Sequence, residues 1–356
     1  MFLNKIKLKN FRSIKDLELH FSPNTTQIFG ENGSGKTSLL EAIYICSLGK
    51  SFYKDSLQDI ITWENKSLSI EAKFTKSDVE NITGVELSNG KKRYYHNGNS
   101  FSSAIGYAGN LYCVAIRPED ISIVIGSSSD KRDYLDRSLS LIDNAYLSRL
   151  ARYHKALQQR NSLLKNWSRN SQDFTEIETW SDLLAKDGTY LTHKRRTFLE
   201  YIIQQLFGEI LGSGLLEKVS LEYSPGGSED YSQYIEKLSS SINKDLQFGY
   251  TTYGAHKDSF NIFFMENKKF SDVCSRGQAR LLSILLKLGE AMVIKNRYNH
   301  SPILLVDDIN AEIDQVNREI VLNYIKKISC QTIFTSISDK PILDNCELIN
   351  LIEKMQ

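Results

Sequence analysis

The sequence predicts an α/β fold in which one lobe contains the sheets and a second, largely helical lobe bears a short coiled arm. Three observations predict it. A glycine-rich loop at 30–35 stands between a short strand and a helix, an apolar strand at 303–306 ends in two carboxylates, and residues 121–211 between them have helical periodicity. We therefore expect a discontinuous first lobe, at 1–120 and 295–356, around an inserted second lobe at 121–294.

The N-terminal part of the chain has the alternation typical of strands. Apolar and polar side chains alternate at 5–9 and at 16–21, as expected where one face of a strand is buried. Asn89-Gly90 and Asn97-Gly98 are dipeptides typical of tight turns between strands. These patterns predict several strands joined by hairpins in the first lobe.

The loop after the predicted strand at 25–29 fits the pattern G-x-x-x-x-G-K-[ST], and apolar residues at helical spacing follow it. Glycines let backbone N–H groups turn towards phosphates, and the helix N-terminus adds partial positive charge. Lys36 would reach the β- and γ-phosphates, and the Thr37 hydroxyl would hold Mg²⁺. The predicted nucleotide-binding residues are Gly30, Glu31, Asn32, Gly33, Ser34, Gly35, Lys36, Thr37 and Ser38.

The strand at 303–306 forms the second part of the predicted site. Four consecutive apolar residues predict a strand that is buried on both faces. Acids at the carboxyl end of such a strand lie where open α/β sheets bind ligands. Asp307 would hold Mg²⁺ together with Thr37, and Asp308 would position or polarise a water for attack on the γ-phosphate. The sequence therefore predicts an ATPase with Lys36 and Asp308 as its catalytic residues.

The second lobe contains a seam of apolar side chains at alternating four- and three-residue steps, which predicts a short antiparallel coiled arm. The seam consists of Tyr146, Leu150, Tyr153, Leu157, Leu164 and Trp167, and it is interrupted at Arg160. Residues 145–170 include basic side chains and no acidic ones, a composition that suits binding to a phosphate backbone. A solvated helix face explains the same pattern equally well. The candidate DNA contacts are Arg149, Arg152, Lys155 and Arg160.

A short polar segment stands before a long apolar helix, one helix ahead of the acidic strand. Ser275-Arg276-Gly277-Gln278 resembles the signature motif of ABC-type ATPases, although an ordinary helix N-cap has a similar sequence. The resemblance implies an ABC-type P-loop ATPase head in which Ser275, Arg276, Gly277 and Gln278 meet the γ-phosphate of a nucleotide held by the other subunit. Asp314 lies in 311–314, where such ATPases carry their D-loop.

Over nearly its whole length the chain resembles the RecF family. The paired Asp307-Asp308 suits this family, since most ABC-type ATPases have glutamate at the second position. The other segments that carry the resemblance are Asn10-Phe11-Arg12-Ser13, Arg117-Pro118-Glu119-Asp120, 131–137, 151–161 and Tyr253-Gly254-Ala255-His256-Lys257-Asp258, where Ala255 replaces the proline typical of the family.

The resemblance implies a cytoplasmic protein of recombinational repair and replication that uses ATP and Mg²⁺. It implies an ATP-dependent homodimer that binds DNA, single-stranded and duplex, at gaps or junctions and helps to load a recombinase. It further implies RecR and RecO as partners, with RecA acting downstream, slow ATP hydrolysis as the step that releases DNA, and Arg12 as an additional nucleotide-binding residue.

The sequence does not decide the role of two segments. His256 and Lys257 suit either catalysis or a structural role, and the resemblance gives them a position but no role. Many ABC-type ATPases carry a switch histidine after the strand that follows the acidic one. This chain has 335–338 (Thr-Ser-Ile-Ser) there, and no histidine follows His300. The pattern favours slow ATP hydrolysis that acts as a timer over the fast ATP hydrolysis of a motor protein.

Composition limits the classes that fit. The chain has 356 residues, enough for two lobes, and 44 basic and 43 acidic side chains give a net charge of +1. DNA binding would therefore need a local basic patch. The 5 cysteines form no CxxC pair, which suits a reducing compartment. No long apolar run and no signal-peptide core occur, so we expect a cytoplasmic location and no membrane.

Four alternatives share some of these motifs. A membrane-transport ATPase needs far fewer residues between Lys36 and Asp307. A chromosome-structural SMC-like ATPase needs a longer coiled arm, and an ATPase-linked nuclease needs another catalytic domain after Asp308. A binding-only scaffold that keeps ATP as a structural ligand stays open, because motifs for binding do not establish turnover.

Overall fold

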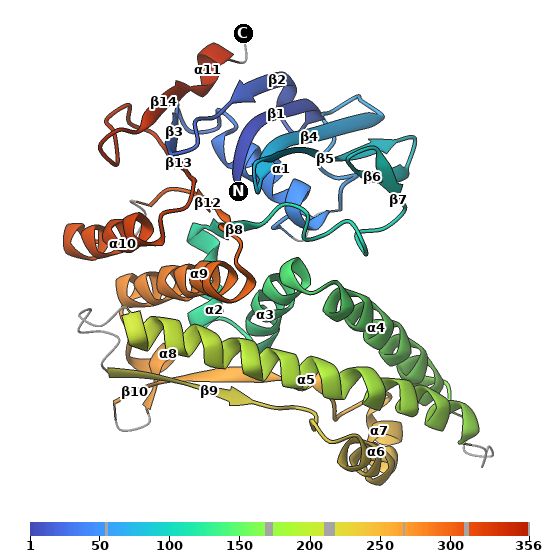
Figure 1. Cartoon of the computed structure of the whole chain (residues 1–356). Coiled ribbons are helices and arrows are strands. Elements are labelled where there is room, and N and C mark those ends of the chain that lie inside the picture. The colour runs from blue at the N-terminus through green and yellow to red at the C-terminus, as the bar shows by residue number, and fades with distance from the viewer. Residues whose placement is uncertain (54–55, 168–173, 210–217, 266–267, 310–312, 355–356) are drawn as a thin grey trace.

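The computed structural model describes residues 1–53, 56–167, 174–209, 218–265, 268–309 and 313–354. They form an upper lobe that holds the two larger sheets and a lower lobe made mostly of helices (Figure 1). Both the N-terminus and the C-terminal helix lie in the upper lobe, so the chain leaves this lobe and returns to it. The α/β class with a helical second lobe and a coiled arm is therefore confirmed.

The upper lobe begins with an antiparallel sheet of strand order β2-β1-β4-β5-β6-β7. Every second residue of β4 is buried, so that one face of the sheet packs on the core. Asn89 and Gly90 have φ angles of 49° and 76°, the left-handed pair that a tight hairpin turn requires. The strands are β1 (Phe2–Phe11), β2 (Ile14–His20), β4 (Ser67–Lys76), β5 (Val79–Ser88), β6 (Lys91–His96) and β7 (Asn99–Phe101).

The second sheet of the upper lobe is parallel and has the order β14-β3-β13-β12-β8. Helix α1 (Lys36–Leu48) contacts strands of both sheets, and most of its residues are buried. Because the strands are parallel, the segments that follow β3, β12 and β13 meet at one edge. The strands are β3 (Thr25–Phe29), β8 (Cys113–Ile116), β12 (Ile303–Val306), β13 (Thr332–Ser336) and β14 (Glu347–Asn350), which leads into α11 (Leu351–Lys354).

The lower lobe is built around the pair α4 and α5, which pack along each other as the arm (Figure 1). Asp143 caps the start of α4 through the Tyr146 backbone N–H, and Ser127 and Asp130 form a capping box at α3. The helices are α2 (Ser122–Ile125), α3 (Ser128–Ile142), α4 (Asn144–Lys165), α5 (Thr175–Glu209), α6 (Tyr231–Ser240), α7 (Ile242–Phe248) and α8 (Phe270–Val273), with 3-10 turns η1 (Pro118–Ile121) and η3 (Ala255–Lys257). A small sheet of β9 (Val219–Ser224), β10 (Ser259–Phe264) and β11 (Lys268–Lys269) completes the lobe.

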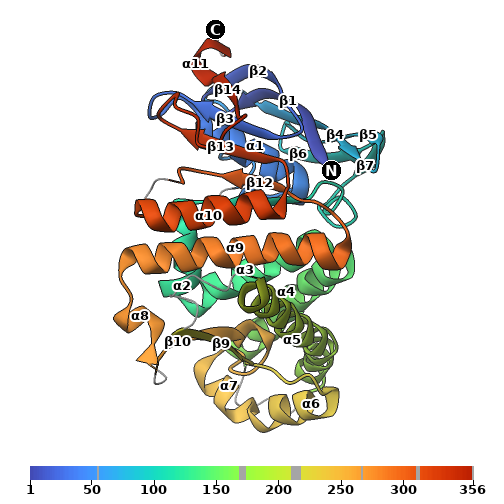
Figure 2. The same cartoon turned by 60° about the vertical axis from the view of Figure 1, so that its left-hand side comes forward.

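Two helices lie between the lobes, as Figure 2 shows: α9 (Arg276–Tyr298) and α10 (Gln315–Ile328). Residues 279–294 of α9 are buried without interruption, as expected for a helix that is covered on all sides. The predicted boundary between residues 294 and 295 therefore falls inside a continuous helix. In the part of the chain that the structure describes, no helix is long and apolar enough to cross a membrane.

The predicted strands at 5–9, 16–21, 25–29 and 303–306 and the helical region at 121–211 are confirmed where the structure describes them. The turn at 225–227 contacts a buried carboxylate. The backbone N–H groups of Gly226 and Gly227 donate to Asp258 Oδ1 at 2.7 and 3.3 Å, and Asp258 is fully buried. The turn is thus part of a buried polar network, because a buried carboxylate needs donors.

Candidate nucleotide-binding site

The glycine-rich loop adopts the conformation that its sequence predicts. Gly33 and Gly35 have φ angles of 81° and 93°, which strain any residue with a Cβ, and α1 begins directly after Gly35. A Cβ on Gly30 would lie 2.9 Å from Ser34 Oγ. That hydroxyl is buried and, among the described residues, has no hydrogen-bond partner. An unsatisfied hydroxyl inside a glycine loop at a helix N-terminus fits a site that accepts phosphate.

The Lys36 side chain folds back over the loop. Its Nζ donates to the carbonyl oxygens of Gly30 and Glu31, both at 2.7 Å. Burial lowers the pKa of the amine, while the negative charges of Asp307 and Asp308 act in the opposite direction. The lysine is thus positioned above the loop with its charge directed at the space where a phosphate would sit.

Asp307 connects the loop to the acidic strand. The Thr37 hydroxyl donates to Asp307 Oδ2 at 2.9 Å, and the Thr335 hydroxyl donates to Oδ1 at 2.5 Å. Asp307 is almost fully buried at the end of β12, whereas Thr335 belongs to the neighbouring β13. A hydroxyl and a carboxylate at this distance are the hard oxygen ligands that Mg²⁺ prefers. The two predicted metal ligands are therefore brought together, and the donor set fits the ion.

Asp308 is exposed at the mouth of the site. Its φ angle is 43°, a left-handed conformation that aspartate adopts more readily than most residues. Its backbone N–H donates to Thr335 Oγ1 at 3.1 Å, which holds the turn in place. The same threonine hydroxyl therefore contacts both neighbouring aspartates, and the sequence did not indicate this bridge.

These residues enclose one open pocket of about 380 Å³. The two predicted catalytic residues and both predicted metal ligands line it. The predicted loop residues Gly30, Glu31 and Ser34 are not part of this lining, but the carbonyl oxygens of Gly30 and Glu31 hold the Lys36 side chain that is. The complete lining is Ser13, Asn32, Gly33, Gly35, Lys36, Thr37, Ser38, Tyr53, Pro118, Glu119, Asp307, Asp308, Thr335, Ser336 and Ile337.

Arg12 lies beside the pocket and contacts a buried carboxylate. Its Nε and Nη2 donate to the two oxygens of Glu41 at 2.5 and 2.9 Å, and Ser51 Oγ donates to Glu41 Oε1 at 2.5 Å. The guanidinium also lies 5.5 Å from the centre of the Tyr53 ring. Its neighbour Ser13 and Tyr53 line the pocket, so Arg12 supports the wall of the site from behind.

The predicted signature residues lie outside this pocket. Ser275 is the N-cap of α9: its Oγ accepts from the Gln278 backbone N–H at 3.2 Å, and Gln278 Oε1 accepts from the Ser275 N–H at 2.9 Å. Arg276 and Gly277 form the first turn of the helix. Within the described residues, none of the four lines the pocket of its own chain. This placement leaves the signature available to a second subunit.

Asp314 caps the next helix of the chain. Its Oδ1 accepts from the Asn317 backbone N–H at 2.8 Å at the start of α10. Residues 311 and 312 of the predicted D-loop lie outside the described residues, so the structure places only the end of this segment.

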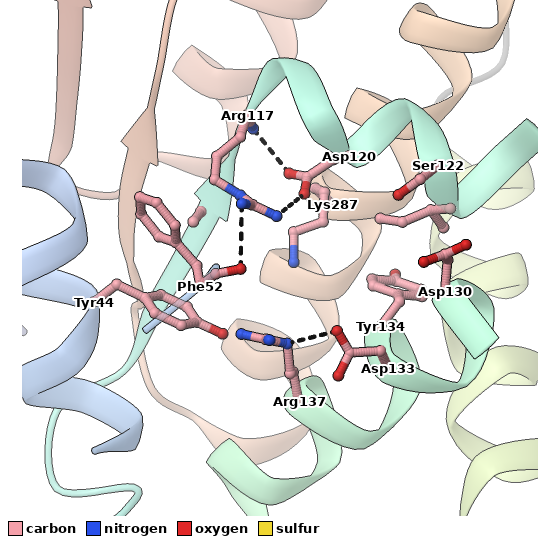
Figure 3. Close-up of a pocket in the computed structure, with 12 residues that line it drawn as sticks. Tyr44, Phe52, Arg117, Asp120, Ser122, Asp130, Asp133, Tyr134, Arg137 and Lys287 are labelled. Carbon is pink, nitrogen blue, oxygen red and sulfur yellow. Dashed lines mark hydrogen bonds and ion pairs between the residues drawn. The ribbon is translucent and has the colours of Figure 1, made fainter. Parts of the chain in front are cut away.

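A junction between the lobes lies next to the nucleotide pocket (Figure 3). Arg117 Nη2 donates to Asp120 Oδ1 at 2.7 Å, and Arg137 Nε donates to Asp133 Oδ2 at 2.9 Å, around a cavity of about 60 Å³. The cavity has room for about two waters and none for a nucleotide. Arg280 of α9 donates to the Arg117 carbonyl oxygen at 2.5 Å. The signature helix is therefore hydrogen-bonded to the segment whose Pro118 and Glu119 line the pocket.

The predicted DNA contacts on α4 have different surroundings. Arg152 Nη2 lies 2.6 Å from Asp187 Oδ1, and Arg149 Nη1 lies 3.3 Å from the same oxygen. Lys155 is exposed. Arg160 is fully buried and pairs with Asp245 Oδ2 at 2.7 Å. The prediction that Arg160 contacts DNA is therefore wrong, because solvent and a phosphate backbone cannot reach it. Its position in the four–three spacing of the seam was the signal for burial.

His256 has a structural environment. Its Nε2 lies 2.9 Å from the Thr251 carbonyl oxygen and must donate to it, so Nδ1, 2.8 Å from the Tyr153 hydroxyl, accepts from that hydroxyl. Burial is the main cause that lowers the pKa of His256 to about 4. Both ring nitrogens are thus used within the lower lobe, far from any residue that lines the nucleotide pocket. Lys257 is exposed.

Sequence reasoning did not identify several residues of the site. Ser13, Tyr53 and Glu119 reach the pocket from three separate segments. Thr335 lines the pocket and bonds to Asp307, and Arg280 bonds to the Arg117 carbonyl oxygen next to the pocket-lining Pro118. Burial raises the pKa of Tyr53 to about 12, so this ring is neutral at the edge of the site. Ser13 and Glu119 lie in segments that carry the family resemblance, and Thr335 lies in the segment 335–338 that has no switch histidine, but none of these patterns indicated the contacts.

Comparison with known proteins points to one family. The family model described as "RecF/RecN/SMC N terminal domain" matches residues 2–356. The DNA replication and repair protein RecF of Clostridioides difficile is 31% identical over 365 residues, which cover 99% of this chain and 96% of that protein. The RecF of Lachnospira eligens is 30% identical over 361 residues, which cover 100% and 98%.

Two solved structures resemble this one closely. They are structures of the recombination mediator protein RecF in the RecFOR pathway, one with ATP and one with ATPrS. Each has a TM-score of 0.88 and 27% sequence identity, and the match covers 98% of this chain and 96% of the other.

Proposed function

The chain belongs to the RecF family of DNA replication and repair proteins, and from this premise we propose that it is an ATPase whose ATP-bound dimer binds DNA at gaps or junctions and helps to load a recombinase. The observation that carries the proposal is the contact of Thr37 and Thr335 with Asp307. It joins the phosphate loop, the acidic strand and the following strand into one ATP site.

The chain's own residues supply most of the chemistry that hydrolysis needs. The loop N–H groups and Lys36 bind the phosphates and stabilise the charge that develops on them. Asp308 orients and polarises a water for in-line attack on the γ-phosphorus, as the bond to the β–γ bridging oxygen breaks and ADP and phosphate form. Thr37 and Asp307 would hold Mg²⁺, which would offset negative charge on the phosphates.

Slow turnover is part of the proposal. Residues 335–338 stand where many ABC-type ATPases carry a switch histidine, and the Thr335 hydroxyl is already used by Asp307 and Asp308. A threonine bears no positive charge, so it cannot stabilise the transferred phosphate as an imidazolium does. ATP would therefore persist long enough to act as a timer that keeps the dimer on DNA.

The partners follow from the relatives. Their solved structures belong to the RecFOR pathway, and we propose that this chain likewise acts with RecO and RecR, ahead of the recombinase RecA. Ser275, Arg276, Gly277 and Gln278 would complete the partner subunit's ATP site, which their absence from their own pocket supports.

The test measures ATP turnover of the wild type and of Asp308→Asn with duplex, single-stranded and gapped DNA. We expect DNA to stimulate slow turnover in the wild type. The variant keeps the shape of the side chain but loses its charge, so ATP binding should persist while turnover falls by roughly two or more decades. Sedimentation should show a longer-lived ATP-bound dimer. Normal turnover in the variant would contradict the assignment of Asp308, and ATP-dependent DNA binding without wild-type turnover would favour the scaffold alternative.

A further inference from the structure

An exposed aromatic pair lies at the end of α7, away from the nucleotide site. The side chains of Phe248 and Tyr250 are 51% and 44% exposed, and their ring centres are 5.7 Å apart with an interplanar angle of 34°. Gly249 between them has a φ angle of 72°, which turns the chain so that both rings lie on one side of the turn. Exposed aromatic faces of this kind are available for stacking.

Two lysines border the pair. Lys257 Nζ lies 5.3 Å from the centre of the Tyr250 ring, and a Cβ placed on Gly249 would be 3.7 Å from the Lys165 Cα. Both lysines are exposed, and within the described residues neither has a carboxylate partner. We call Lys165, Phe248, Tyr250 and Lys257 the aromatic–lysine patch.

The patch is held rigidly on the arm. The Thr251 backbone N–H and hydroxyl donate to Asn161 Oδ1 at 2.8 and 2.7 Å. The Thr252 N–H and hydroxyl donate to Asp245 Oδ1 at 2.9 and 2.6 Å. These bonds fix the segment between Tyr250 and Lys257 to α4 and α7, so little ordering remains to oppose ligand binding.

Positive charge extends from the patch along the lower lobe. Burial lowers the pKa of His256, and the charges of Lys257, Arg132 and His154 lower it further. Burial also lowers the pKa of His154, where Asp136 acts in the opposite direction and Arg195, Lys50 and Arg132 add to the lowering. Elsewhere on α4, Arg149 and Arg152 share the carboxylate of Asp187, which offsets one of their two charges. Lys165 and Lys257 have no such carboxylate among the described residues, so both of their charges face the solvent.

We propose that the aromatic–lysine patch binds single-stranded DNA, with bases stacked on Phe248 and Tyr250 and phosphates beside Lys165 and Lys257. Aromatic rings flanked by cations recognise unpaired strands because every base has a face to stack, whereas a duplex hides those faces. The inference rests on the proposed DNA-binding function and adds the surface that contacts the single strand.

The experiment measures binding of a fluorescent oligothymidine strand, an abasic strand and a duplex to the full chain with ATP, at several salt concentrations. Phe248→Ala with Tyr250→Ala should weaken binding of the thymidine strand by roughly tenfold per ring and leave duplex binding nearly unchanged. The wild type should prefer the thymidine strand over the abasic one, and the double variant should not. Lys165→Gln with Lys257→Gln should lower the salt slope by about 0.7 per lost phosphate contact.

The matched controls are Trp63→Ala, an aromatic that is 87% exposed in the upper lobe, and Lys186→Gln, an exposed lysine of the arm. Both should bind every strand as the wild type does.

A strand containing 5-iododeoxyuridine should cross-link to Phe248 or Tyr250 on irradiation. If the wild type binds single strands and the patch variants match it, the patch is not the site, while DNA binding by the protein stands. If the wild type binds no DNA in any state, both the patch and the proposed function fail.

Discussion

At the scale of single residues, Asp307 determines the geometry of the site. It is nearly buried, and two hydroxyls from different elements share its oxygens. A buried carboxylate without such donors would be costly, so the donors also keep the acidic strand and the phosphate loop in register.

The Thr335 hydroxyl is expected to control turnover more than binding. In Thr335→Val, Asp307 loses a donor and the Asp308 N–H loses its acceptor, at a cost that corresponds to roughly tenfold or more in rate. Thr335→Ser retains the hydroxyl and serves as the control. Single-turnover hydrolysis and nucleotide titration should show slower chemistry with nearly unchanged ATP affinity in the valine variant alone. Slower turnover in Thr335→Ser with no slowing in Thr335→Val would mean that packing of the methyl group, not the hydroxyl, matters.

His256 is expected to make stability depend on pH. Burial lowers its pKa from 6.5 to about 4 in the folded chain, so between these values the unfolded chain binds more protons. Stability therefore rises with pH through this window, and as pH falls from 6.5 to 4 the histidine removes on the order of 2–3 kcal/mol. Urea unfolding of the wild type and of His256→Asn between pH 4.5 and 7.5 measures this term. The stability difference between the two should shrink as pH falls; a constant difference would contradict the assignment.

At the scale of elements, the arm owes its geometry to a seam that includes one charged residue. Arg160 occupies a seam position and donates to Ser181, Asp245 and Thr251, which lie on α5, α7 and the segment after α7. Trp167 and Phe174 stack with ring centres 4.6 Å apart near the far end of α4 and α5. The arginine thus joins three segments that apolar packing alone would leave free to slide.

Breaking the buried pair of Arg160 and Asp245 is expected to destabilise the lower lobe. Arg160→Met leaves Asp245 buried with its charge uncompensated, which costs roughly 3–5 kcal/mol. Arg160→Met combined with Asp245→Leu removes both charges and should recover part of that loss. Lys155→Gln, an exposed change on the same helix, is the control and should stay within about 0.5 kcal/mol of the wild type. Chemical denaturation measures all three; a neutral Arg160→Met would contradict the role of the pair.

At the scale of the whole molecule, the signature helix starts away from the nucleotide pocket yet contacts its edge. Ser275 begins α9, and one turn later Arg280 bonds to the Arg117 carbonyl oxygen beside the pocket-lining Pro118. A second copy that docks on this helix start would therefore affect the pocket through α9. The remaining prediction tests whether sites are shared in this way.

Mixing two inactive variants is expected to restore part of the activity. Lys36→Ala cannot hold the phosphates, and Ser275→Arg places bulk and charge in the proposed interface. In a mixed dimer, the intact Lys36 of one subunit faces the intact Ser275 of the other, so one of two sites is complete. Turnover of the mixture, compared with each variant alone, measures the effect. ATP turnover by strictly monomeric Ser275→Arg would refute the sharing of ATP sites between subunits. If mixed dimers form without recovery of turnover, either both sites must work together or the signature acts within its own chain.

The local parts of this protein follow from short stretches of its sequence. The phosphate loop, the acidic strand and the hairpins each depend on residues a few positions apart, so spacing and side-chain chemistry were enough to predict them. The tertiary structure alone decided which segments meet. Thr335 reaches Asp307 because β13 pairs with β12, and Asp187 forms ion pairs with Arg149 and Arg152 because α5 packs on α4. Strand order and helix packing create such contacts between residues that are distant in the sequence, and local periodicity does not predict them.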